Sequence, residues 1–193
     1  MKDVEITVQV FNTFDEIDKI LQQQGFKMIE NYQLNDWYFS KLGNLQNIEY
    51  SELINNSFLV RQVLDSRETS YLCYKKKEFD KFGNVISEEK TKTKIDSLQN
   101  AIMIFKSSGL NNYAAVKNNS YVYKKDEIIF VVQVIEKLGI FIEYEEDDSM
   151  TNMKQQEKID YMCNVVNSLN LKLGNDYFCK KVFMLLNKNA NVE

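Results

Sequence analysis

The sequence predicts an α+β protein in which eight antiparallel strands form a barrel or a cupped sheet with helices outside it. Eight segments show the period-two alternation or the β-branched and aromatic content of strands. Two helical segments with N-cap signals separate them, and the order strand, capped helix, glycine, strand occurs twice. We therefore expect one domain over residues 1–193, with a barrel over 1–148 and two C-terminal helices over 149–193 packed on it.

The strands are expected at residues 4–11, 32–40, 58–64, 71–79, 85–95, 113–123, 128–134 and 140–146. In the first strand the apolar residues share one face, and Glu5, Thr7 and Gln9 share the other. A polar turn at 65–69 joins the third and fourth strands, and Phe82-Gly83-Asn84 is typical of the next hairpin turn. The polar stretch 41–57 is expected to be a loop.

Capping signals define the helices. Thr13 with Glu16 three residues later is a capping box, and Gly25 ends that helix. Asp96 is expected to cap a second helix, with Gln99 at the box position and Gly109 at its end. Apolar residues at helical spacing predict two further helices, at 153–171 and at about 176–187.

Composition limits the chemistry. The 193 residues include no histidine and no proline, so a Ser-His-Asp triad, a Cys-His dyad and a His-ligated metal are excluded. The net charge of −4 argues against a general nucleic-acid binder, and no apolar run is long enough to span a membrane. No N-terminal signal is visible, and three widely spaced cysteines fit a reduced compartment. We therefore expect a cytoplasmic protein; its oligomeric state, a homodimer included, stays open.

Two groups of charged residues are the candidate site. Glu143 and Glu145 lie two apart on one strand and share a face, and Glu5 adds a third acid. Arg61, Lys75 and Lys117 are cations on other strands. A lumen with carboxylates on one side and cations on the other suits a complex of a divalent metal with a polyphosphate.

Each of these patterns also has a plainer interpretation. A Glu-x-Glu pair on a strand is more often a solvated outer face, and Lys75-Lys76-Lys77 is often an exposed edge that blocks strand pairing. Lys90, Lys92 and Lys94 are expected on a solvated face or in place of lost site residues. Cys73 is expected inward as a small filler, because no histidine can activate it.

The order of the motifs resembles the CYTH family, the triphosphate tunnel metalloenzymes, and within it the class IV adenylyl cyclase branch. The matching segments, which span about residues 3–187, are Glu5-Ile6-Thr7-Val8-Gln9, Gln33-Leu34-Asn35-Asp36-Trp37-Tyr38-Phe39, Phe58-Leu59-Val60-Arg61, Tyr71-Leu72-Cys73-Tyr74-Lys75, Val116-Lys117, Leu138-Gly139-Ile140-Phe141-Ile142-Glu143-Tyr144-Glu145 and Leu169-Asn170-Leu171.

The resemblance implies a tunnel barrel that processes a nucleoside triphosphate or another triphosphate. It assigns Mg²⁺ or Mn²⁺ to Glu5, Glu143 and Glu145, and the phosphates to Arg61, Lys75 and Lys117. The chain departs from the family pattern on the metal side, with Thr7 for a glutamate, Gln9 for a lysine and Gln133 for an aspartate, and Asn119 replaces an arginine.

Three hypotheses follow. The first is an active enzyme, either an adenylate cyclase or a triphosphate phosphohydrolase. The second is a degenerate module that binds triphosphate or other polyanions without efficient turnover, as the metal-side departures suggest. The third is a structural or interaction protein that no longer binds phosphate.

Overall fold

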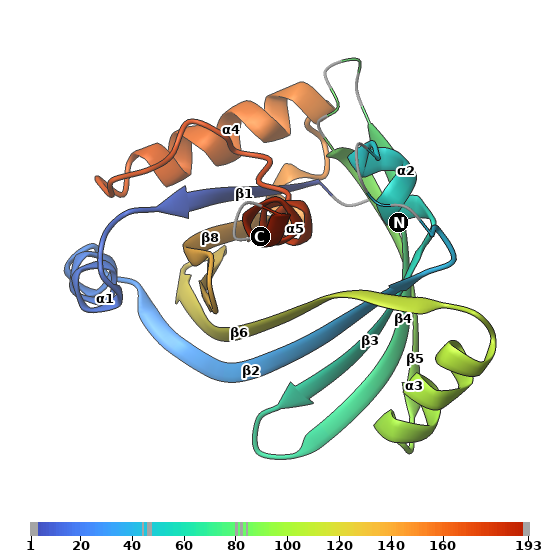
Figure 1. Ribbon diagram of the computed structural model, residues 1–193. Coiled ribbons are helices and arrows are strands. Elements are labelled where there is room, and N and C mark those ends of the chain that lie inside the picture. Colours follow the sequence, from blue (N-terminus) through green and yellow to red (C-terminus); the bar gives the residue numbers. More distant parts are fainter. Residues whose placement is uncertain are drawn as a thin grey trace. The chain divides into compact units, whose positions relative to one another are not determined.

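The computed structural model describes residues 4–43, 45, 48–79, 81, 83 and 85–190. It confirms the α+β class: eight antiparallel strands pair in one sheet, and helices connect or follow them (Figure 1). The strands are β1 (Glu5–Val10), β2 (Lys27–Ser40), β3 (Ser57–Leu64), β4 (Glu68–Phe79), β5 (Val85–Ile95), β6 (Asn111–Lys125), β7 (Ile128–Ile135) and β8 (Gly139–Glu145). The helices are α1 (Phe14–Gln23), α2 (Tyr50–Asn55), α3 (Leu98–Ser107), α4 (Gln155–Asn167) and α5 (Lys181–Ala190), with a 3₁₀ turn at Asp148–Met150.

The strand order in the sheet is β1-β8-β7-β6-β2-β3-β4-β5. The described residues form two compact units, and both β2 and β6 contribute to each. Unit 1 contains residues 33–117 and the segment from 181 onward, and unit 2 contains the residues up to 32 and residues 118–180. Helix α4 therefore lies in unit 2 and α5 in unit 1, and the single domain over 1–193 stays a prediction.

In unit 2, one face of the strands forms the hydrophobic core. Alternate residues of β1, β7 and β8 supply it, and residues of α1 and α4 pack against them. The predicted capping box is confirmed: the Glu16 N–H donates to Thr13 Oγ1 (3.3 Å) and the Thr13 N–H to Glu16 Oε2 (2.9 Å). Because strand side chains alternate, the opposite face carries the polar set that includes Glu5 and Glu143.

In unit 1, α3 covers one face of β2, β3 and β4. Its core contains Phe39, Val60, Ala101 and Leu110. The α3 N-cap is Ser97, whose side chain accepts from the Asn100 N–H, so the expectation of Asp96 as the cap is wrong by one residue. A hydroxyl at this position reaches the N3 amide as well as a carboxylate would.

Several boundaries differ from those expected. The stretch 41–57 is not wholly a loop, because it contains the short helix α2. Helix α5 begins at Lys181, not near residue 176, and β2 begins five residues earlier than expected. Within the predicted turn at 82–84, Phe82 and Asn84 lie outside the described residues. Among the described helices, none combines the length and apolarity that crossing a bilayer needs.

The segment 172–179 runs along β1 within unit 2. The Thr7 and Phe11 N–H groups donate to the carbonyls of Tyr177 and Lys172, both at 2.8 Å. The Gly174 N–H donates to the Gln9 carbonyl at 2.8 Å and the Cys179 N–H to the Thr7 carbonyl at 3.0 Å. Strand β1 therefore has hydrogen-bond partners along both edges, β8 on one side and this segment on the other.

Candidate functional site

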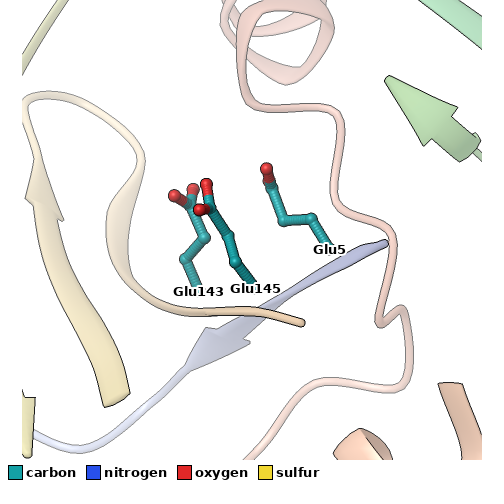
Figure 2. A group of neighbouring side chains, drawn as sticks. All are labelled: Glu5, Glu143 and Glu145. Atoms are coloured by element: carbon teal, nitrogen blue, oxygen red, sulfur yellow. The ribbon is translucent and has the colours of Figure 1, made fainter. Parts of the chain in front are cut away.

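Three carboxylates converge in unit 2. In the antiparallel register, Glu5 lies opposite Glu145 and Thr7 lies opposite Glu143. One carboxylate oxygen from each glutamate lies within 4.8 Å of the other two. Figure 2 shows Glu143 and Glu145 rising from β8 and Glu5 from β1, with their carboxylates turned the same way. The pattern prediction that these three acids share a face is therefore confirmed.

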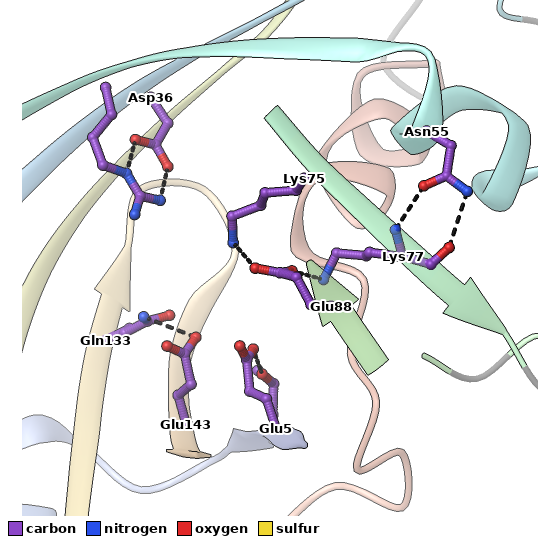
Figure 3. Close-up of polar contacts among 10 residues, drawn as sticks. Glu5, Asp36, Asn55, Lys75, Lys77, Glu88, Gln133 and Glu143 are labelled. Atoms are coloured by element: carbon purple, nitrogen blue, oxygen red, sulfur yellow. Dashed lines mark hydrogen bonds and ion pairs between the residues drawn. The ribbon is translucent and has the colours of Figure 1, made fainter. Parts of the chain in front are cut away.

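Two buried neutral side chains hold the carboxylates. Gln133, which is 4% exposed, donates from Nε2 to Glu143 Oε2 at 3.1 Å (Figure 3). Thr7, also buried, donates from Oγ1 to Glu5 Oε1 at 3.1 Å. Gln9 instead donates to the backbone carbonyl of Leu138. The positions where the family resemblance expects further charge are thus occupied by neutral groups, two of which hydrogen-bond the remaining acids.

The donor set suits a hard divalent cation. Carboxylate oxygens are the ligands that Mg²⁺ and Mn²⁺ prefer, and Mg²⁺ keeps several waters beside one or two protein carboxylates. Glu5 on β1 and Glu145 on the adjacent strand β8 lie directly opposite each other. Two like charges in such a pair destabilise a sheet. A bound cation would offset that repulsion, so the three glutamates fit the expected metal.

A second charged surface lies in unit 1, on the face of the strands opposite α3. Cross-strand registers put Arg61 beside Tyr71, Cys73 beside Lys92, Lys75 beside Lys90 and Lys77 beside Glu88. The Lys92 ammonium lies 3.7 Å from the centre of the Tyr71 ring, which confirms that β4 and β5 present these side chains on one face. We call this the basic face; its cations are Arg61, Lys75, Lys77, Lys90, Lys92 and Lys94.

Asp36 positions Arg61. Its Oδ1 accepts from Arg61 Nε at 2.7 Å and its Oδ2 from Nη2 at 2.6 Å, a bidentate pair (Figure 3). The side chains are 5% and 19% exposed. Burial alone would lower the pKa of Arg61, but the Asp36 carboxylate raises it above its usual value. The guanidinium is therefore always charged.

Glu88 lies between two lysines of the basic face. Its Oε1 is 2.9 Å from Lys75 Nζ and its Oε2 is 2.6 Å from Lys77 Nζ (Figure 3). Burial would raise the pKa of Glu88, yet the two ammonium groups lower it to about 2. The basic face thus carries six cations and two carboxylates, Asp36 and Glu88. It therefore has an excess of four positive charges, although the net charge of the chain is −4.

The other predicted residues are placed as follows. Lys75 is not on an edge strand, because β4 lies between β3 and β5, so the edge interpretation is wrong. Lys117 is exposed between the buried Val116 and Asn118, and its contact with phosphate stays a prediction. Burial raises the pKa of the Cys73 thiol, which agrees with its role as a small filler.

Sequence reasoning missed Asp36 as the partner of Arg61 and Glu88 as the partner of the lysines. Both contacts depend on strand register, which the pattern of one strand does not give. Asp36 lies opposite Arg61 through the register of β2 with β3, two strands separated by residues 41–56. Glu88 lies opposite Lys77 through the register of β4 with β5, which includes a bulge at Glu78/Phe79.

No family model matches the chain. A protein of Methanocaldococcus jannaschii named as a putative adenylate cyclase is 25% identical over 179 residues, which cover 91% of this chain and 93% of that protein.

Several solved structures share the fold, including the following two. A protein of Pyrococcus horikoshii superposes with a TM-score of 0.71 at 16% identity, covering 96% of this chain and 99% of its own. A Hippeastrum protein, described as a putative adenylyl cyclase with a dominant triphosphatase activity, has a TM-score of 0.62 at 12% identity, covering 98% and 96%.

Proposed function

We propose that this protein, for which the comparisons support a CYTH or adenylyl cyclase-like family, is a metal-dependent enzyme that acts on triphosphates. The observation that carries the proposal is the convergence of Glu5, Glu143 and Glu145 within 4.8 Å. The excess of cations on the basic face supports it independently, because a polyphosphate needs several positive partners.

In this proposal the three glutamates hold Mg²⁺ or Mn²⁺, which when bound supplies Lewis-acid stabilisation of phosphoryl oxygen charge. Arg61, oriented by Asp36, and Lys75 bind phosphate oxygens and neutralise charge that develops during transfer. Lys117 is assigned the same role by resemblance.

Two reactions fit this arrangement. In a cyclase, the ribose 3′-hydroxyl attacks the α-phosphate and pyrophosphate leaves; in a triphosphatase, water attacks the terminal phosphate. The test is incubation with ATP, inorganic triphosphate and thiamine triphosphate in Mg²⁺ or Mn²⁺, with cyclic AMP, pyrophosphate and phosphate measured separately. Glu143→Gln should abolish turnover, whereas Glu136→Gln, on an exposed turn of unit 2, should not. Absence of product from all three substrates would refute the enzyme proposal.

A second candidate is a triphosphate-binding module without efficient turnover. The neutral donors Thr7 and Gln133 favour it, since they satisfy Glu5 and Glu143 in the absence of a metal. This candidate predicts triphosphate binding of similar affinity in EDTA and in Mg²⁺ by calorimetry. Strict dependence of binding on the metal would contradict it. Anion binding that Lys75→Ala leaves unchanged would instead favour an interaction protein.

A further inference from the structure

Glu88 binds its two lysines as a phosphate would. Each of its oxygens faces a different ammonium, at 2.9 Å for Lys75 and 2.6 Å for Lys77. Two lysines that share the two oxygens of a carboxylate can share two oxygens of a phosphate group equally well, because charge-assisted bonds to both anions have the same lengths. The lysine pair is therefore a formed anion site whose present anion is a side chain of the same chain.

The rest of the site is held without Glu88. Asn55 accepts from the Lys77 N–H at Oδ1 (2.8 Å) and donates from Nδ2 to the Lys77 carbonyl (3.0 Å), which holds the Lys77 backbone against α2. Figure 3 shows this contact on the far side of Lys77 from Glu88. Lys75 lies on an interior strand, opposite Lys90. Removing the Glu88 charge therefore leaves the backbone of both lysines in place, with their side chains on the same face of β4.

The Glu88 side chain can also move from the two lysines to solvent. It lies on β5, the last strand in the sheet order, near the bulge at Glu78/Phe79. Lys90, the next residue on the same face of β5, is exposed, so a change of rotamer at Glu88 can bring its carboxylate to water without moving the core of unit 1.

We propose that Glu88 is an internal counter-ion that occupies a two-lysine phosphate site in the free protein, and that an incoming triphosphate displaces it and binds both Lys75 and Lys77. The inference rests on the proposed function for the class of ligand only, and requires neither metal nor turnover. It adds Lys77 as a phosphate ligand and makes Glu88 a residue that sets affinity. In the wild-type protein, triphosphate can bind both lysines only in the molecules in which Glu88 has left them. The apparent dissociation constant for triphosphate is therefore the intrinsic constant divided by the fraction of such molecules.

The test is calorimetric titration of inorganic tripolyphosphate into the protein in EDTA at low ionic strength. Glu88→Gln keeps the shape and removes the charge, and we expect it to bind about tenfold more tightly than wild type. Glu89→Gln, one residue away on the other face of β5, is the matched control and should stay within about twofold. Lys77→Met added to Glu88→Gln should remove the gain.

Glu88→Asp is a second variant that tests the proposal if Glu88→Gln does not fold. It keeps the charge but is one methylene too short to reach both ammonium groups, so it should bind tripolyphosphate more tightly than wild type and less tightly than Glu88→Gln. Equal or weaker binding by both variants would overturn the proposal, as would a gain in Glu88→Gln that survives Lys77→Met. Failure of the enzyme proposal looks different: tripolyphosphate then binds with this ranking of variants, but no substrate is turned over.

Discussion

Replacement of Asp36 by asparagine should destabilise the protein markedly, because it leaves the Arg61 guanidinium buried without a counter-charge. The pair has side-chain exposures of 5% and 19% and two short bonds, of 2.7 and 2.6 Å. Removing one partner of a buried ion pair costs about 3–5 kcal/mol. Asparagine can still accept one of the two bonds and Arg61 retains some contact with water, so we expect about 2–3 kcal/mol at neutral pH.

Urea unfolding at pH 7, followed by circular dichroism, measures this change. Asp15→Asn, on the exposed first turn of α1, is the matched control and should change the free energy of unfolding by less than about 0.5 kcal/mol. The double replacement Asp36→Leu with Arg61→Met should recover most of the loss, because an apolar pair of similar volume is nearly neutral in such a site. A change of under about 0.5 kcal/mol for Asp36→Asn, or additive losses in the double variant, would refute the reasoning.

Three further predictions follow from other contacts. The pKa of Glu88 is lowered to about 2, so its contribution of about 3 kcal/mol is present above its unfolded pKa near 4.5 and lost as the pH falls through 2. Urea unfolding between pH 7 and 2 should therefore show a shallower loss of stability for Glu88→Gln, and parallel curves would contradict this. Glu143→Gln should weaken Mn²⁺ binding about tenfold by calorimetry, while Glu136→Gln leaves it unchanged; equal affinities would exclude Glu143 as a ligand. Thr13→Ala should lower the free energy of unfolding by about 1 kcal/mol through loss of the α1 capping box, and an unchanged urea midpoint would argue against that role.

The sequence predicted most of the fold because its signals are local. The alternation around Glu5 and the Thr13 capping box each depend on a few consecutive residues, and the structure confirms both. Helix α2 was missed because a six-residue helix has too few turns to display an apolar period against a polar background. The Ser97 cap was missed because two adjacent polar residues offer equally good capping groups.

The candidate site was predicted only in part, because its contacts depend on register. Parity along one strand correctly grouped Glu143 with Glu145, and Lys75 with Lys77. Parity cannot say which residue of a neighbouring strand lies opposite, so the partner of each lysine could not be assigned. Glu88 lies opposite Lys77 only because of the alignment of β4 with β5, and a shift by one residue would turn Glu88 to the other face.

The position of β1 between β8 and the segment 172–179 also sets an order on the assembly of the acidic cluster during synthesis. Strand β1 is translated before the other described elements, and both of its hydrogen-bonding neighbours follow more than 120 residues later. The strand that carries Glu5 therefore has no partner strand during most of translation. Its pairing requires contacts between residues that are far apart in the sequence, which form slowly. The cluster can form only after β8 has emerged, so a chain that terminates before Glu143 lacks it.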